Sequence, residues 1–435
     1  MQQLASSVLW LKRAKPKCAL LLTASFLLAF HTARLPAIQV GEDRLLSQEG
    51  PARPLEESQL SVDPNNPKHL LVGVIQFDSA DGNDKTCVAW SSFDGGSEWS
   101  RHAFPAQGCA DPWGVILSDG SAIMVMLGYM NGHDDNAFLF RSPDGGRIWS
   151  DAPLGLGTHH DHPMVTAQGK QVYVVSSQGV QANSTQRRSS VFVIRSDDDG
   201  NTFGEPTHGI PSILGFAAVG PILLRDGGLV VGIHDPNREG VADRPARPHS
   251  WLLRSPDQGK TFSEPLLISE SCESRGGWPS MAADGNDRLF WLCIAYKFNG
   301  VLVQRSEDRG ESWSKPLRLN HSGTANSFTP SIAVNNDGVI GVSWYEIHGK
   351  NCFDVYFTAS LDSGKTFLRE VKVSSATSCP NTPQDKGAFD PGTTFGAGGD
   401  YSGLAATSDG LFHVVWSDAR TGIYQLRTAT VRVRR

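Results

Sequence analysis

The chain has 435 residues, a formal net charge of −6, 45 glycines and 25 prolines, and 39% of its residues are hydrophobic. This length admits two or three average domains or one large β-propeller, and the many glycines, prolines and short apolar segments favour an all-β fold. The acidic balance, with basic residues clustered only at the N-terminus, argues against a nucleic-acid partner.

The first segment has the pattern of a secretory signal. A 13-residue apolar run, 18–30, follows four basic residues, which are Lys12, Arg13, Lys15 and Lys17. The run is short for a membrane span. We therefore predict that residues 1–37 are a signal peptide, with an uncleaved signal anchor as the alternative. The mature chain is expected to be secreted or periplasmic, without a membrane span, and a monomer.

One eight-residue pattern, Ser-x-Asp-x-Gly-x-x-(Trp/Phe), occurs six times. The serines are 50, 54, 59, 51 and 54 residues apart, which is a spacing typical of repeat architectures. We call these segments the octets; they are Ser92–Trp99, Ser142–Trp149, Ser196–Phe203, Ser255–Phe262, Ser306–Trp313 and Ser360–Phe367.

Each octet is predicted to be a turn between two strands. The aspartate can accept hydrogen bonds from backbone N–H groups two residues on, and the glycine supplies a positive φ. The aromatic residue returns to the core and positions the next strand. The octets are therefore interpreted as structural, and their aspartates are not expected to do chemistry.

A short strand precedes each octet, and a hairpin lies further upstream in every unit. The hairpin turns number seven: Pro64–Pro67, Ser118–Gly120, Ala167–Gly169, Arg225–Gly228, Asp284–Asp287, Asn335–Gly338 and Ser408–Gly410. Each unit thus has the four strands of a propeller blade, and we predict seven blades, with six as the alternative. The last unit ends after its third strand, so a strand from the N-terminus, 37–41, is expected to complete it. Residues 38–435 are predicted to form this one domain.

Six cysteines remain after the predicted signal, as expected for disulfides in an exported protein. Sequential pairing closes segments of 22, 21 and 27 residues: Cys87 with Cys109, Cys272 with Cys293, and Cys352 with Cys379. In each pair, one cysteine lies near the loop before a first strand and the other near the loop after a second strand. The three bridges are therefore expected to brace loops of one face.

The octets resemble Asp-boxes, the BNR repeats of the sialidase-like superfamily, and the segments Ser61–Gly73, Gly399–Gly403 and Val414–Arg420 are similar to bacterial members. The resemblance implies a secreted propeller that acts on a glycan. Sialidases use an arginine triad, a tyrosine nucleophile paired with a glutamate, and an aspartic acid/base. Their first arginine lies in a Phe/Tyr-Arg-Ile-Pro motif, and the corresponding region here, 57–61, has no arginine.

Ligands of propellers bind near the axis, where loops opposite the octets converge. Tyr345 and Glu346 are the candidate nucleophile and base, with Tyr401 facing Glu346 as the alternative pairing. Asp78 or Asp111 is the candidate general acid. The candidate substrate-binding residues are Arg275, Arg420, Trp278, His160, His162, His234 and Asp400. The two arginines would hold an anionic group, although Arg420 could instead form a salt bridge with Asp418.

The run His159–His162 is locally unusual, because three imidazoles and one carboxylate occur in four residues. A metal site that includes His234, acid/base chemistry and ordinary loop polarity are all open interpretations. We predict no cofactor and no metal.

Three functions compete. The first is an exo-acting, sialidase-like glycoside hydrolase for a terminal, anionic sugar. The second is a non-catalytic propeller that binds glycans or proteins, and the third is a metal-assisted polysaccharide lyase or hydrolase. The expected partner is a glycan or glycoconjugate.

Overall fold

The structure is a computed structural model. It describes residues 37–49, 53–78, 84–180, 188–214, 217–235, 249–273, 277–295, 300–321, 326–349, 352–380 and 398–435. Pro36–Arg435 form one compact unit. The predicted targeting segment lies almost entirely outside the described residues and stays a prediction.

The described residues form antiparallel sheets that divide into seven four-stranded blades, numbered in chain order. Blade 1 contains β3 (Leu55–Val62), β4 (Leu70–Phe77), β5 (Lys85–Ser92) and the first half of β6 (Ser100–Ile116). Blade 2 contains the second half of β6, β7 (Ala122–Tyr129), β8 (Ala137–Ser142) and β9 (Leu154–Gly155). Blade 3 contains β10 (His160–Gln168), β11 (Gln171–Val180), β12 (Arg188–Ser196) and β13 (Thr207–Leu214).

The other blades repeat this order. Blade 4 contains β14 (Ala217–Leu223), β15 (Leu229–Asp235), β16 (His249–Ser255) and β17 (Leu266–Ser269). Blade 5 contains β18 (Cys272–Glu273), β19 (Ser280–Ala283), β20 (Leu289–Ala295), β21 (Val301–Ser306) and β22 (Leu317–Arg318). Blade 6 contains β23 (Ser327–Val334), β24 (Ile340–His348), β25 (Cys352–Ser360) and β26 (Val371–Lys372). Blade 7 contains β27 (Gly403–Ala406), β28 (Phe412–Asp418) and β29 (Gln425–Arg434).

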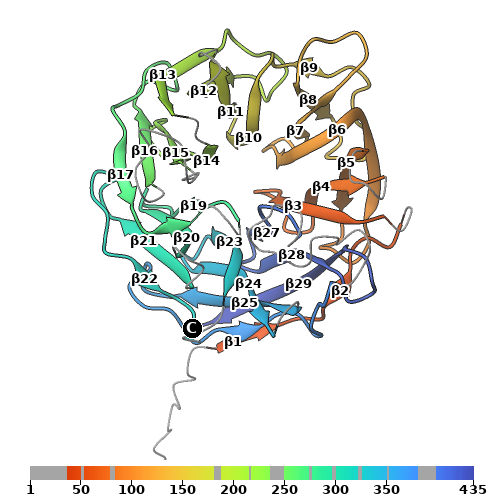
Figure 1. Ribbon diagram of the computed structural model, residues 1–435, viewed down its shortest axis with the longest axis vertical. Helices are drawn as coiled ribbons and strands as arrows, with labels where there is room; N and C mark the ends of the chain where they lie inside the picture. Colours follow the sequence, from red (N-terminus) through yellow and green to blue (C-terminus); the bar gives the residue numbers. More distant parts are fainter. Residues whose placement is uncertain are drawn as a thin grey trace, which may run out of the picture. The chain divides into compact units, whose positions relative to one another are not determined.

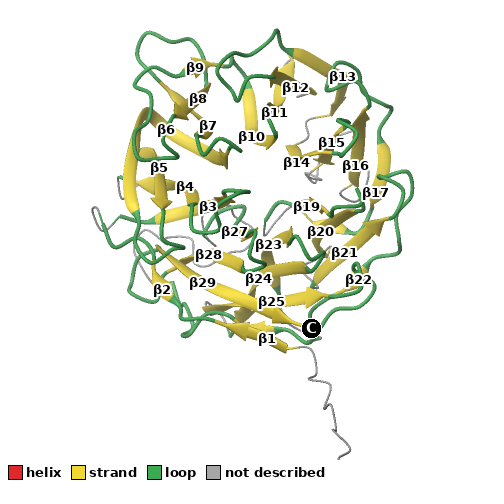
Figure 2. Cartoon of the chain, turned by 180° about the vertical axis from the view of Figure 1, so that it is seen from behind, coloured by secondary structure: helices red, strands yellow, loops and turns green. Residues whose placement is uncertain are grey.

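The blades are arranged in a ring around a central axis, with the first strand of each blade innermost (Figures 1 and 2). Each inner strand contacts the next one, and β27 of blade 7 contacts β3 of blade 1. Seven hydrophobic clusters fill the spaces between adjacent blades. The all-β propeller predicted from the repeats is confirmed.

A segment from the start of the described chain lies on the outer edge of blade 7. β1 (Ala37–Val40) pairs antiparallel with β29, and β2 (Arg44–Leu45) pairs with the same strand. The side chain of Leu46 is buried in the cluster between blades 7 and 1. The sequence pattern predicted a further strand, 37–41, at this edge.

The six octets share one hydrogen-bond pattern that differs in detail from the prediction. In the fifth octet, Ser306 Oγ accepts the N–H of Gly310 at 2.7 Å and donates to Asp308 Oδ1 at 2.7 Å. Asp308 Oδ1 accepts the N–H of Ser312, four residues on, rather than two as predicted. The serine hydroxyl thus holds the turn up to the glycine, and the aspartate carboxylate holds the residues after the glycine. The glycines have positive φ, as predicted.

All three predicted disulfides are present, joining Cys87 to Cys109, Cys272 to Cys293, and Cys352 to Cys379. Cys87 lies near the start of the third strand of blade 1, and Cys109 lies where β6 crosses into blade 2. The bridges therefore lie toward the blade ends opposite the octets. Among the described residues, no helix is long and apolar enough to cross a membrane.

Candidate functional site

The inner strands share an irregularity at the ends opposite the octets. A β-bulge interrupts the register of the inner strand in blades 1, 2, 3, 4 and 6. A bulge adds one residue to a strand and turns its side chain in a new direction. The same bulge therefore occurs at one level around the axis in these five blades.

One residue of each bulge has a positive φ: 59° at Glu57, 50° at Asp111, 52° at His162, 46° at Gly220 and 49° at Thr329. Four of these five residues are not glycine, although glycine adopts this conformation without strain. Proline follows four of them and disfavours helical backbone at the preceding residue. Such strained residues are concentrated at functional sites.

Blades 5 and 7 place Trp278 and Tyr401 at the equivalent position, two residues before the first paired residue of the inner strand. We call these seven residues the bulge ring. They are Glu57, Asp111, His162, Gly220, Trp278, Thr329 and Tyr401.

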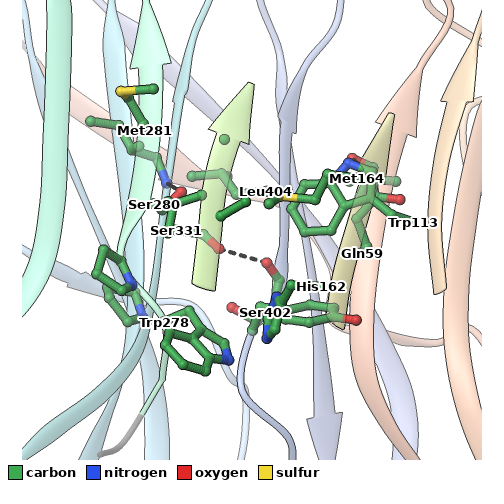
Figure 3. A pocket seen from close by; sticks show the side chains of 18 residues that line it. Gln59, Trp113, His162, Met164, Trp278, Ser280, Met281, Ser331, Ser402 and Leu404 are labelled. Atoms are coloured by element: carbon green, nitrogen blue, oxygen red, sulfur yellow. Dashed lines mark hydrogen bonds between the residues drawn. The ribbon is translucent and has the colours of Figure 1, made fainter. Parts of the chain in front are cut away.

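A cavity of about 140 Å³ lies on the axis, and residues from all seven blades line it. His162, Gly220, Trp278 and Tyr401 of the bulge ring are among its lining residues. Figure 3 shows Trp278 and His162 near one end, and Met164, Met281 and Leu404 further along the cavity. A bond from Ser331 Oγ to the carbonyl oxygen of Ser402, 2.6 Å long, lies between these two levels. The cavity thus joins a polar, aromatic end to an apolar end.

Three carboxyl groups adjoin the polar end through residues that line it. His162 donates its backbone N–H to Asp111 Oδ2 at 3.3 Å, and its Nε2 lies 3.9 Å from Asp111 Oδ1. Trp278 donates both its backbone N–H and its indole N–H to Asp400, each at 2.9 Å. Asp400 in turn donates its N–H to Glu57 Oε1 at 3.3 Å.

The protonation of these acids is strongly perturbed. Burial, together with the charges of Asp111 and Asp400, raises the pKa of Glu57 well above that of an ordinary glutamate. Burial also raises the pKa of Asp111, and His162 offsets only part of this rise. Burial lowers the pKa of His162, but the charges of Asp111 and Asp161 outweigh it and the net change is a rise. The pKa of Glu57 is therefore raised without an opposing positive charge, whereas Asp111 and His162 stabilise each other's charged forms.

Aromatic groups surround this polar end. His162 contacts the ring of Trp278 edge-on, with centroids 4.7 Å apart, and the ring of Tyr401 at 6.1 Å. Tyr401 also contacts Trp113 at 5.5 Å. Burial and the nearby carboxylates raise the pKa of the Tyr401 hydroxyl well above that of a free tyrosine. Tyr401 is therefore a neutral hydroxyl group at neutral pH.

Several buried polar atoms have no hydrogen-bond partner among the described residues. Four of them belong to residues around the axis: Glu57 Oε2, His234 Nε2, Thr329 Oγ1 and Tyr401 OH. His234 lies behind Trp278, with ring centroids 6.1 Å apart, and its Nδ1 contacts Ser250 Oγ at 2.9 Å. Burial lowers the pKa of His234 to about 3. Buried polar groups without a partner are costly in free energy.

A model of the BNR repeat-like domain matches residues 155–414, more than half of the chain. The chain belongs to the BNR repeat-like family. No curated protein matches the sequence.

One solved structure supports the fold of this BNR repeat-like chain, and two others are similar at lower TM-scores. A protein of unknown function from Dyadobacter fermentans has a TM-score of 0.56 at 13% identity, and the alignment covers 92% of this chain and 100% of that one. A Hadza microbial sialidase has a TM-score of 0.48 at 16% identity, with 83% and 73% covered. An α-L-arabinanase from Penicillium chrysogenum has a TM-score of 0.47 at 14% identity, with 74% and 92% covered.

The BNR repeat-like domain brings together Asp111, Tyr401, Trp278, His162, His234 and Asp400 of the predicted residues. Tyr345 lies instead among core side chains between blades 6 and 7, stacked on Phe328 with centroids 4.8 Å apart. Its hydroxyl accepts the N–H of Ser417 at 3.0 Å. Glu346, the next residue, accepts the indole N–H of Trp344 at 3.4 Å. Neither residue lines the cavity.

The other predicted residues lie elsewhere. Arg420 binds Asp418 with two hydrogen bonds, of 2.6 and 2.9 Å, which is the alternative that the sequence left open, and it also pairs with Asp43. Asp78 accepts hydrogen bonds from Gln76 and Thr86 beyond the end of β4.

His160 contacts Ser176 Oγ at 2.7 Å and Leu156 O at 2.9 Å, and burial lowers its pKa to about 4. Arg275 lies outside the described residues. Among the described residues, no cluster of histidine, cysteine and acidic residues is placed to hold a metal ion.

Glu57 and Thr329 were missed by the sequence analysis. A signal for them exists, because an X-Pro pair recurs in five of the seven units, in or just before the first part of the inner strand. These pairs are Asp111-Pro112, His162-Pro163, Gly220-Pro221, Trp278-Pro279 and Thr329-Pro330. Glu57-Ser58 takes the same place in the first unit.

Proposed function

We propose that this chain is an exo-acting glycoside hydrolase whose site is the polar end of the axial cavity. The observation that carries the proposal is a pair of buried carboxyl groups beside the axis. Glu57 accepts the N–H of Asp400 and has a pKa raised well above the usual value, and Asp111 accepts the N–H of His162. Glycoside hydrolysis uses such a pair, one as a general acid and one as a base or nucleophile.

Glu57 is proposed to protonate the leaving-group oxygen of the glycosidic bond. Its raised pKa favours the protonated form of the carboxyl group, which a general acid requires. Asp111 is proposed to activate water or attack the sugar carbon, with His162 stabilising its negative charge. The rings of Trp278 and Tyr401 offer apolar surface to the sugar, and Asp400 holds the indole of Trp278.

We propose a neutral sugar, rather than the anionic sugar implied by the resemblance to sialidases. Among the described residues, no lysine or arginine lines the cavity. The guanidinium of Arg420 is already bonded to Asp418 and Asp43. A sugar carboxylate placed beside Asp111 and Asp400 would meet like charges, which is unfavourable.

The test is turnover of 4-nitrophenyl glycosides of neutral sugars and of a fluorogenic sialoside by the purified protein. The variants are Glu57→Gln, Asp111→Asn and Glu346→Gln, the last being a buried carboxyl group outside the bulge ring. We expect turnover of a neutral glycoside that falls about 10²- to 10⁴-fold in the first two variants and is unchanged in the third.

Other outcomes change the assignment. Activity that depends on Glu346 but not on Glu57 would place the chemistry away from the cavity. Turnover of the sialoside would overturn the choice of a neutral sugar. Binding of glycans without turnover of any substrate would favour the non-catalytic glycan-binding propeller.

A further inference from the structure

The axial cavity has apolar walls on two opposite sides. Trp278 and Met281 of blade 5 lie on one side of it, and Trp113 of blade 2 and Met164 of blade 3 lie on the other (Figure 3). Leu404 of blade 7 lies between these two sides. A ligand in the cavity therefore meets indole and thioether groups on two sides.

Trp113 is the tryptophan of these walls to which the proposed mechanism gives no role. It lies two residues after Asp111 in β6, and its ring contacts that of Tyr401 with centroids 5.5 Å apart. Its side chain is partly exposed, whereas four other tryptophans are fully buried, namely Trp90, Trp291, Trp344 and Trp416. Trp113 thus presents indole surface to the cavity that the packing of the blades does not cover.

Polar side chains that line the cavity between these walls already have partners within the protein. Gln59 donates to the carbonyl oxygen of Leu60 at 3.0 Å and accepts the N–H of Gly114 at 2.8 Å. Ser331 donates to the carbonyl oxygen of Ser402 at 2.6 Å. A hydroxyl group that points at an indole or thioether wall would lose the hydrogen bonds that it makes with water.

The volume of the cavity suits one sugar ring. A cavity of about 150 Å³ holds one benzene molecule, and this cavity measures about 140 Å³. Equatorial substituents of a pyranose lie around the edge of its ring, and axial substituents project from its two faces. In D-glucose and D-xylose, the hydroxyl groups on C2, C3 and C4 are all equatorial, so that both faces present C–H groups. D-Galactose has an axial hydroxyl on C4, and D-mannose has one on C2.

We propose that the cavity accepts one pyranose unit of gluco or xylo configuration, and that Trp113 selects this unit as the wall opposite Trp278. This inference rests on the proposed function, in which the cavity is the sugar site and Glu57 and Asp111 do the chemistry. An axial hydroxyl on either face would meet an apolar wall and lose a hydrogen bond, which disfavours the galacto and manno epimers.

The experiment measures kcat/KM for the 4-nitrophenyl glycosides of D-glucose, D-xylose, D-galactose and D-mannose, each in both anomeric forms. The variants are Trp113→Ala, which removes one wall, and Trp113→Phe, which keeps an aromatic wall. Trp251→Phe is the matched control, because Trp251 is also partly buried but stacks on His249 in blade 4 and does not line the cavity. Thermal shift with the four free sugars measures binding independently of turnover.

We expect wild type to prefer the glucoside or the xyloside over the galactoside and the mannoside by about tenfold to a hundredfold. Trp113→Ala should lower turnover of the preferred glycoside and reduce this preference to a few-fold, because an axial hydroxyl no longer meets a wall on that side. Trp113→Phe should keep most of the preference. Trp251→Phe should match wild type in both turnover and preference.

A wild-type preference for the galactoside or the mannoside would overturn this inference and leave the proposed hydrolase intact. An unchanged preference in folded Trp113→Ala would overturn the role of Trp113, and if that variant fails to fold, a complete loss of preference in Trp251→Phe but not in Trp113→Phe would do the same. Selective binding of D-glucose or D-xylose without turnover of any glycoside would support the choice of sugar and overturn the hydrolytic role. If wild type neither binds nor turns over any of these sugars, the proposed function fails and this inference fails with it.

Discussion

Side chains at the inner-strand bulges are retained at a cost in backbone strain. Glu57, Asp111, His162 and Thr329 have φ values that glycine tolerates freely, and only Gly220 is a glycine. Each such residue costs about 1–3 kcal/mol. Three of the four carry ionisable groups whose pKa values are raised by burial or by one another's charge. The strain is therefore best explained by the chemistry of the side chains.

Replacing Glu57 by glutamine should make the stability of the protein less dependent on pH. An acid whose pKa is raised in the folded state binds its proton more tightly there than in the unfolded chain. Stability is then present below the unfolded pKa of about 4.5 and is lost as pH rises toward the folded pKa. Glu57→Gln should therefore be more stable than wild type at pH 8 and equally stable at pH 4, in urea unfolding at both values. An equal difference at both pH values would contradict this account.

At the scale of elements, each blade has a constant end and a variable end. The octets repeat one hydrogen-bond pattern, in which a serine hydroxyl holds the glycine N–H. The bulge at the other end repeats its backbone geometry but changes its side chain from blade to blade. A repeat architecture can thus build an asymmetric site, because the scaffold and the chemistry occupy opposite ends of the same element.

The Cys87–Cys109 bridge should support the site as well as the fold. Cys109 lies two residues before Asp111, and its bridge closes a 22-residue segment. Loop entropy gives about 3 kcal/mol for a bridge of this size. We expect the double serine variants of Cys87/Cys109 and of Cys352/Cys379 to melt at similarly reduced temperatures. Turnover of the preferred glycoside at 20 °C should fall mainly in the first. Equal turnover in both would show that the bridge near Asp111 has no special role.

The whole molecule is a ring in which the first and last blades meet at the candidate site. The N–H of Glu57 in β3 bonds the carbonyl oxygen of Gly398 at 2.9 Å, and the N–H of Asp400 bonds Glu57 Oε1. Gly399 between them has a φ of 102°, and a Cβ there would lie 2.2 Å from Glu57 Cγ. The proposed acid is therefore positioned by contacts that exist only when the ring is closed.

Removing residues 37–48 should loosen this closure. The deletion leaves β29 with an unpaired edge, exposes the site of Leu46, and removes the carboxylate of Asp43 from Arg420 and Arg427. We expect a lower melting temperature, a greater tendency to aggregate and reduced turnover. Arg44→Ala, which loses only an exposed pair with Glu42, is the control and should behave as wild type. Wild-type melting of the deletion variant would show that β1 does not stabilise the ring.

The repeated local signals predicted the fold well. The octets placed the turns, because the bonds from Ser306 and Asp308 stay within the octet. The pairing of Cys352 with Cys379 followed from their short separation of 27 residues along the chain. Such features depend on neighbours in the chain, and so their sequence pattern is sufficient.

The candidate site was only partly predictable, for a physical reason. Asp111, His162 and Tyr401 were found because topology puts inner-strand ends at the axis. Tyr345 looked equally suitable, but it packs against Phe328 in the core, since alternation along a strand sends its side chain between blades. The sequence around Glu57 carries no feature that marks a site residue, because the bulge that brings its carboxyl group to Asp400 is a property of the folded strand.

The sequence by itself determined the repeat, the turns and the disulfide pairs and favoured seven blades over six, because each depends on interactions within one unit or between consecutive units. Only the tertiary structure decided which side chains meet near the axis and which acid has its pKa raised most clearly by burial and neighbouring charges. Glu57 and Asp400 are more than 340 residues apart in the chain and become neighbours when the ring closes. The raised pKa of Glu57 depends on that approach and on burial by several blades together, and neither property is present in any single repeat.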